Sequence, residues 1–152
     1  MLSKEKFTAL VLEKEKTLYR VAMAMLKNEN DAQDAVQQAI LLSFERLSTL
    51  KKEEYFSTWL VRVLINVCKK QLKKRRREVE LTDNTADCYI VTEKIETKML
   101  VESLPLKFRE VTILYYIENF KVSEIAKILS VPQGTVKSRL SKARELLQSQ
   151  LK

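Results

Sequence analysis

Apolar side chains recur along the first half of the chain at the spacing of three amphipathic helices. The first helix is predicted to end near residues 27–28, and the second to begin at Asn30 or Asp31, either of which can cap a helix. The third helix has the clearest apolar stripe, formed by Phe56, Trp59, Leu60, Val63, Leu64, Val67 and Cys68. Residues 1–77 are therefore expected to form a three-helix domain.

The second half of the chain begins without a clear helical period. Residues 78–94 include a turn-rich stretch at 82–85, which is typical of a linker. A helix is expected over residues 95–102, and Pro105 starts the next one at a position favoured in a first helical turn. The predicted fold class is thus all-α, with two small helical domains, residues 1–77 and 95–152, joined by a flexible linker.

A short helix, a brief turn and a longer helix close the chain. Ser123 is predicted to cap the short helix over residues 123–129, and a tight break over 130–134 precedes a longer helix from Thr135. The expected inner face of that longer helix consists of Val136, Leu140, Ala143 and Leu147. This arrangement predicts a helix-turn-helix, in which the second helix enters the major groove of DNA.

The net charge of +8 is divided unevenly along the chain. Residues 1–77 carry +8, residues 78–103 carry −5 and residues 104–152 carry +5. Two basic blocks therefore flank an acidic connector. Positive surfaces attract nucleic acid through its phosphates, whereas the acidic connector is expected to avoid duplex DNA.

Composition removes several classes of function. One Gly and no His among 152 residues disfavour strand-rich folds, glycine-rich phosphate cradles and histidine-based catalysis. The two cysteines, Cys68 and Cys88, are too few for a zinc site or a secreted disulfide framework. No metal, cofactor or small-molecule substrate is expected, and an enzyme acting on nucleic acid is the weakest alternative. The lack of a signal-like start and of a membrane-spanning run favours a cytoplasmic protein.

The outward face of the last helix carries candidate DNA contacts. Short serine side chains permit close approach to the bases, and lysines reach guanine acceptors or phosphates. Arg144 lies at the flank, and the lone Gly134 allows the helix to start close to a neighbouring segment or to a phosphate. The candidate contacts in this motif are Ser123, Gly134, Thr135, Lys137, Ser138, Arg139, Ser141 and Lys142. An ordinary helical hairpin with a solvated basic face is the alternative.

A basic run follows the apolar stripe of the third helix. Residues 69–77 contain seven Lys and Arg side chains and no acid, more than compensation of a helix dipole requires. They predict a stripe that tracks phosphates, with a solvated helix end as the alternative. Tyr55 is expected to be exposed for stacking on a base, whereas Phe56 and Trp59 are expected to be buried.

In order and spacing, these motifs resemble a known family. The letters DAQDAVQQ at 31–38, FSTWLVR at 56–62 and then Asn66 are similar to domain two of bacterial RNA polymerase sigma factors of the extracytoplasmic-function type. A second set of residues is similar to domain four of that family, namely LP at 104–105, Arg109, EIA at 124–126, GTVKSRL at 134–140 and AR at 143–144. The two motifs, in this order, cover nearly the whole chain.

The resemblance implies a role for each surface. In the family, the second helix of domain two docks on the clamp helices of the polymerase beta-prime subunit, which assigns core binding to Asp31, Asp34, Gln37, Gln38, Leu41 and Glu45. The following loop and helix capture and melt the minus-ten element, which assigns that contact to Tyr55, Arg62, Asn66, Lys69, Lys70 and Lys73. Domain four reads the minus-thirty-five element upstream. The implied partners are core RNA polymerase, through its clamp helices and beta flap, promoter DNA and an anti-sigma factor.

Three positions depart from the family pattern. Gln38 stands where Glu is usual, Lys70 where Asp is frequent and Ser57 where Arg is frequent. Gln38 and Ser57 weaken the contact assignments at their own positions, and Lys70 adds a positive charge that is compatible with DNA. The predicted function is a non-enzymatic subunit that directs promoter-specific initiation, with a stand-alone helix-turn-helix regulator as the alternative.

Overall fold

The computed structural model describes residues 2–82 and 97–150, and every regular element within those ranges is helical. This confirms the predicted all-α class. The long elements of the first domain are α1 (Lys4–Leu26), α2 (Glu29–Glu45) and α3 (Phe56–Thr82), with short 3-10 turns at Leu47–Thr49 and Glu53–Tyr55. The second domain comprises α4 (Thr97–Glu102), α5 (Leu106–Thr112), a π-helical segment (Ile113–Ile117), α6 (Val122–Leu129) and α7 (Gln133–Gln150).

The end of α3 lies beyond the predicted boundary of the first domain. The helix continues to Thr82, so residues 78–82, which begin the predicted linker, are helical. Because residues 83–96 lie outside the described part of the chain, most of the predicted linker and Cys88 do too. Within the described ranges, none of the helices combines the length and apolar character needed to cross a bilayer.

The junction between α1 and α2 differs from the predicted cap. Lys27 takes a left-handed conformation with φ 59° and closes α1 through a hydrogen bond from its N–H to the Met23 carbonyl. Asn28 is then the first extended residue, and its side-chain oxygen accepts a hydrogen bond from the Asp31 N–H at 3.0 Å. The cap of α2 is therefore Asn28 rather than Asn30 or Asp31, because the left-handed residue ends α1 one residue before it.

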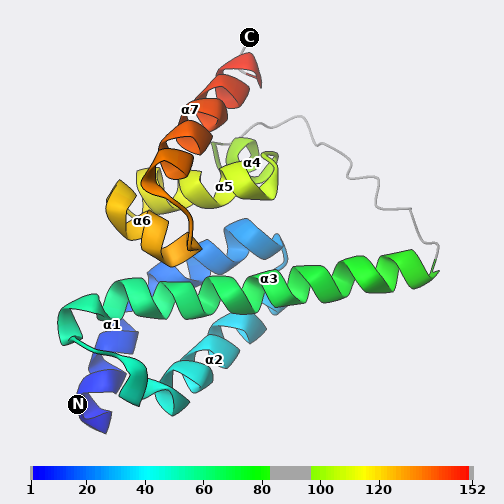
Figure 1. Ribbon diagram of the computed structural model, residues 1–152. Helices are drawn as coiled ribbons and strands as arrows, with labels where there is room; N and C mark the ends of the chain where they lie inside the picture. The colour runs from blue at the N-terminus through cyan, green and yellow to red at the C-terminus, as the bar shows by residue number, and fades with distance from the viewer. Residues whose placement is uncertain (1, 83–96, 151–152) are drawn as a thin grey trace.

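The predicted apolar stripes form the core of the first domain. Leu18, Leu60 and Leu64 are fully buried where the three helices meet. Val61 and Ile65 are also fully or almost fully buried, although they lie off the predicted stripe of α3. These two residues are buried because α6 of the second domain packs against α3, so that the buried residues of both domains form one hydrophobic cluster. Figure 1 shows α3 crossing the molecule between α2 on one side and α4–α7 on the other.

The second domain contains a π-helical segment that shifts the helical phase. α5 ends at Thr112, and the chain continues with wider π-helical turns to Ile117. Ile113 and Leu114 remain buried, but Tyr115, the next residue, is 38% exposed. The wider turn rotates Tyr115 out of the apolar face that a regular α-helix would have continued.

Candidate nucleic-acid and protein interfaces

The helix-turn-helix forms as predicted, with one correction at its first helix. α6 begins after Lys121, whose N–H donates to the Glu124 carboxylate at 2.9 Å, so Lys121 is the cap and Ser123 is a half-buried residue inside the first turn. The earlier start follows from Glu124, which reaches back to that N–H in the manner of a capping box. Ser130, with φ 57°, ends α6, and the chain turns into α7.

The inner face of α7 fixes which side chains face solvent. Val136, Leu140 and Ala143 are buried, and the predicted contacts Lys137, Ser138, Ser141 and Lys142 are exposed. Thr135 and Arg139 are half-buried at the edges of this face. The Ser138 hydroxyl donates to the Thr135 carbonyl at 3.0 Å, and Lys142 lies 3.4 Å from the Glu145 carboxylate.

Gly134 lies in the first turn of α7 rather than in the turn before it. Its φ is not positive, and a Cβ added there would meet no atom within 4 Å. The predicted close approach to a neighbouring segment is therefore wrong in the free chain. A close approach to a phosphate stays a prediction.

Replacing Gly134 with alanine separates these two roles. We expect the free energy of unfolding to stay level or rise by up to about 1 kcal/mol, because alanine is the better helix former. If a phosphate approaches this backbone, binding to the upstream promoter element weakens by about fivefold, or about 1 kcal/mol. Thermal unfolding and quantitative footprinting measure the two effects, with Gln133→Ala at the neighbouring exposed position as control. Unchanged footprints would remove Gly134 from the DNA surface.

The predicted minus-ten residues lie along α3 and at its start. Arg62, Asn66, Lys70 and Lys73 are exposed, as a surface for nucleic acid requires, whereas Lys69 is half-buried. Tyr55 is 45% exposed, as predicted. Its ring lies 5.9 Å from the Lys52 ammonium and 5.6 Å from the Lys127 ammonium, distances suited to cation–π contact.

The aromatic pair next to Tyr55 is mainly structural. Phe56 is buried and stands edge-on to Phe7, with ring centroids 5.8 Å apart. Trp59 is half-buried, with its ring centroid 5.9 Å from that of Phe56.

Cys68, on the apolar face of α3, is buried. Burial raises the pKa of its thiol to about 12, so this thiol stays protonated at neutral pH.

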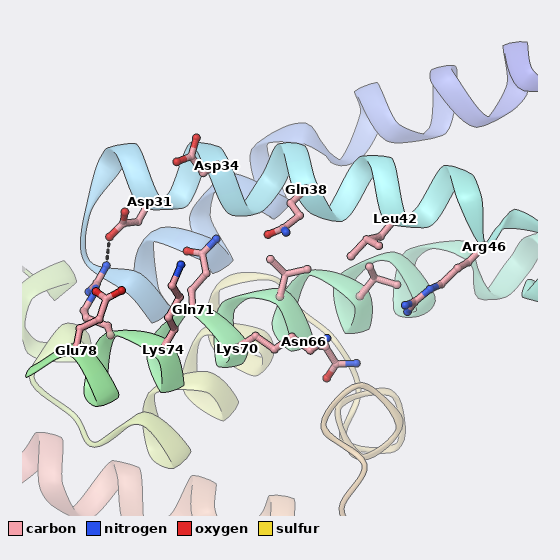
Figure 2. Close-up of a pocket in the computed structure, with 13 residues that line it drawn as sticks. Asp31, Asp34, Gln38, Leu42, Arg46, Asn66, Lys70, Gln71, Lys74 and Glu78 are labelled. Atoms are coloured by element: carbon pink, nitrogen blue, oxygen red, sulfur yellow. Dashed lines mark ion pairs between the residues drawn. The ribbon is translucent and has the colours of Figure 1, made fainter. Parts of the chain in front are cut away.

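A groove of about 580 Å³ runs along the surface where α2 and α3 pack against each other. Figure 2 shows Gln38, Leu42 and Arg46 on the α2 side and Asn66, Lys70 and Lys74 on the α3 side. At one end Asp31 is half-buried and forms an ion pair with Arg75. One wall of the groove thus holds predicted core-binding residues and the other predicted minus-ten residues.

The other predicted core-binding residues are exposed on α2. Asp34, Gln38, Leu41 and Glu45 follow one another at helical spacing and form a ridge beside the groove, and Gln37 faces the opposite groove between α1 and α2. Leu41 is 66% exposed. An apolar side chain so open to water on an otherwise polar ridge suits contact with another protein.

Sequence reasoning missed a pair of buried charges on α5. Arg109 and Glu110 are both buried. The sequence predicted neither burial, since Arg109 was noted only as part of a family motif and Glu110 was not noted. Nη1 of Arg109 donates to the Leu104 carbonyl at 3.0 Å, and Nη2 donates to the Met25 carbonyl at 2.9 Å. The sequence signal that could have revealed them is two adjacent opposite charges within the largely apolar segment 106–114. Charged residues are rarely buried unless they are paired, so such a pair in an apolar segment indicates a buried pair.

The surroundings of Glu110 are cationic. Its carboxylate lies 3.7 Å from the Lys69 ammonium and 4.0 Å from the Arg139 guanidinium. Burial raises the pKa of Glu110, and the charges of Lys69 and Arg139 oppose that rise. Within residues 2–82 and 97–150, no group of three or more Cys, Asp or Glu side chains is arranged to hold a metal ion.

The geometry defines a class of protein, an all-helical protein with a helix-turn-helix in one domain and a cationic helix in the other. The family models agree. The model described as Sigma-70 region 2 matches residues 10–78, and the model described as Sigma-70, region 4 matches residues 95–147.

Sequence relatives identify the family more precisely. The chain is 30% identical to the ECF RNA polymerase sigma factor SigM of Mycobacterium tuberculosis, over 93% of this chain and 74% of that protein. It is 28% identical to the ECF RNA polymerase sigma factor SigW of Bacillus subtilis, over 89% of this chain and 83% of that protein. The chain belongs to the extracytoplasmic-function sigma factors, non-catalytic initiation factors that direct RNA polymerase to promoters.

Solved structures share the architecture. The sigma factor RpoE of Bartonella quintana, in complex with the anti-sigma factor NepR, superposes with a TM-score of 0.84 at 26% identity, covering 95% of this chain and 96% of that one. CnrH, in complex with the cytosolic domain of CnrY, has the same fold, with a TM-score of 0.76 at 23% identity, covering 98% of this chain and 89% of that one.

Proposed function

We propose that this chain divides promoter recognition between its two domains while it is bound to core RNA polymerase. The ridge of α2 holds the polymerase, α3 and Tyr55 hold the minus-ten element, and the outward face of α7 reads the upstream element. The observation that supports this proposal is that most of the predicted contact residues are exposed, and that the three surfaces lie on separate helices of one fold. The chain performs no catalytic chemistry of its own and acts in the cytoplasm.

The physical basis is the tethering of two weak binding modules. Each domain presents a small cationic surface that is expected to bind DNA weakly by itself. Fixing both on polymerase raises the effective concentration of the second contact once the first has formed, so the combined binding becomes selective. Near Tyr55, the chain holds an unstacked base, whose removal from the duplex costs a few kcal/mol.

A protein partner of the anti-sigma kind is part of the proposal. Both solved structures described above are complexes, in which RpoE is bound to an anti-sigma factor and CnrH is bound to the cytosolic domain of CnrY. The close match in fold over almost the whole of this chain supports a similar partner here.

Two equally exposed leucines test the docking ridge. Leu41 on α2 is 66% exposed and Leu12 on α1 is 63% exposed, but only Leu41 lies on the predicted core-binding ridge. We expect Leu41→Arg to weaken association with sigma-free core polymerase by tenfold or more, about 1.4 kcal/mol, because a charge replaces an apolar contact. Leu12→Arg is the matched control and is expected to bind as the unmodified chain does.

Size-exclusion chromatography and fluorescence anisotropy with labelled chain measure this association. Equal loss of binding in both variants would indicate general damage rather than a docking ridge. Unchanged binding in Leu41→Arg would contradict the assignment of this ridge to the polymerase.

A further inference from the structure

Arg144 is an exposed cation at one edge of the outward face of α7. It follows Lys137 and Ser141 at intervals of seven and three residues, so the three side chains lie along one line of the helix. Lys137 and Ser141 are predicted contacts of the upstream element, and the predicted contacts stop at Lys142. Arg144 extends their line by one further turn and is therefore placed to reach DNA beside them.

The Arg144 guanidinium is held by a tyrosine from another element. Its Nη1 donates a hydrogen bond to the Tyr116 hydroxyl at 2.8 Å. The π-helical segment after α5 turns Tyr115 and Tyr116 outward, where they are 38% and 48% exposed. The two rings stand edge-on with their centroids 4.9 Å apart, which restrains the Tyr116 ring. The hydrogen bond thus orders a long exposed side chain that would otherwise sample many rotamers.

The bond to Tyr116 leaves the guanidinium able to bind an anion. Arginine has five N–H donors in a planar fork, and this bond uses one of them. Within residues 2–82 and 97–150, no carboxylate forms an ion pair with Arg144, in contrast to Arg139, which lies 4.0 Å from Glu110. The geometry of the planar fork suits a phosphate group.

The surface beside this bond is open and cationic. A hollow of about 490 Å³ lies between the two tyrosines and the start of α6, with Asn119 and Lys121 in its lining. Lys121 is exposed and caps α6. Because α6 is the first helix of the helix-turn-helix, which in such motifs crosses the DNA backbone, this side of the domain is expected to face phosphates.

We propose that Arg144 binds a backbone phosphate of the upstream element and that Tyr116 is the positioning residue that holds its guanidinium. This rests on the proposed function, because the phosphate belongs to the DNA that α7 reads. Phosphate contacts fix the register of a protein on the duplex without reading its sequence. Arg144 therefore sets how Lys137 and Ser141 meet the base edges, and Lys121 adds positive charge that attracts the same stretch of backbone.

A double-mutant cycle on a promoter fragment bound by the reconstituted polymerase complex tests both roles. Arg144→Ala is expected to weaken binding about fivefold. It also lowers by about one the slope of the logarithm of affinity against the logarithm of salt concentration, because one phosphate contact is lost. Tyr116→Phe removes only the hydroxyl and is expected to weaken binding about threefold, because the guanidinium must then be ordered on binding. In the Arg144→Ala chain, Tyr116→Phe causes no further loss, since the tyrosine acts through the arginine.

Two variants control for the hydroxyl and the charge. Tyr115→Phe removes the neighbouring hydroxyl and is expected to bind as the unmodified chain does. Arg144→Lys keeps the charge and is expected to keep the salt slope. Fluorescence anisotropy at several salt concentrations measures affinity and slope, and thermal unfolding checks that each variant is folded. A loss from Tyr116→Phe that persists in the Arg144→Ala chain would overturn the positioning role, and unchanged affinity and slope in Arg144→Ala would overturn the phosphate contact.

Replacing single DNA phosphates with neutral methylphosphonates locates the contact. At one backbone position this replacement is expected to weaken binding by the unmodified chain and by Lys137→Ala, but not by Arg144→Ala. Equal sensitivity to every replacement in Arg144→Ala and in the unmodified chain would overturn the assignment to the backbone. Promoter binding by the unmodified complex that none of these variants alters would remove the Arg144 assignment alone, whereas no promoter binding by the unmodified complex would contradict the proposed function as well.

Discussion

Replacing Arg109 with alanine is expected to lower the free energy of unfolding by about 3 kcal/mol. The guanidinium is buried and donates to the Leu104 and Met25 carbonyls, at 3.0 and 2.9 Å. The second of these lies at the end of α1, where helix carbonyls lack partners within the helix. The truncation leaves two buried carbonyls without a donor, and it leaves the buried Glu110 with less compensating charge.

Denaturant unfolding followed by circular dichroism measures this loss. Lys107→Ala, at an exposed position of the same helix, is the control and is expected to change stability by less than about 0.5 kcal/mol. Arg109→Lys is expected to recover only part of the loss, because one ammonium group does not reproduce the planar fork that serves both carbonyls. A loss below about 1 kcal/mol in Arg109→Ala would contradict a stabilising role for this buried charge.

Removing the two exposed lysines of α7 is expected to weaken binding to the upstream promoter element strongly. Lys137→Ala and Lys142→Ala are each expected to cost about 1–3 kcal/mol if the ammonium contacts a base edge. If it contacts only a phosphate, the loss is smaller. The slope of the logarithm of affinity against the logarithm of salt concentration then falls by about one, because one fewer phosphate is neutralised. Both side chains are exposed, and Lys142 lies 3.4 Å from the carboxylate of the exposed Glu145.

Footprinting of the polymerase complex on a promoter recovered from genomic fragments measures both losses. Lys16→Ala removes the same charge from an exposed position outside every predicted site, and its footprint is expected to be unchanged. Full protection of the upstream element in both Lys137→Ala and Lys142→Ala would remove these residues from the DNA surface.

Periodic patterns predicted most of the fold, because burial within a helix follows from spacing alone. The stripe through Leu60 and Leu64 was sufficient to define α3, and the break before α7 was sufficient to define the helix-turn-helix. Two caps were assigned wrongly. Asn28, Asn30 and Asp31 can all cap a helix, and the choice of Asn28 depended on where α1 ended. Ser123 was predicted in place of Lys121 because the bond at the start of α6 comes from Glu124, which reaches back to the Lys121 N–H, and not from the side chain at the cap position.

Contacts between the domains had no signal in the sequence. Glu118 gives no indication that its partner is Arg20, which lies 98 residues earlier. Burial of Val61 and Ile65 depends on α6 packing over a face of α3 that periodicity placed outside the core. The predicted contact residues are mostly exposed, as expected, but Lys69 and Arg139 are drawn toward Glu110, which only the tertiary structure shows.

Reconstituted transcription tests the central claim most directly. The purified chain is added to sigma-free core polymerase with a library of genomic promoter fragments, and transcript start sites are mapped. We expect co-elution with core polymerase and initiation at defined sites that share upstream and minus-ten elements, with none from core polymerase alone. Absence of both a core complex and specific initiation would contradict the account, and a dimer bound to a palindromic site without polymerase would establish the stand-alone regulator instead.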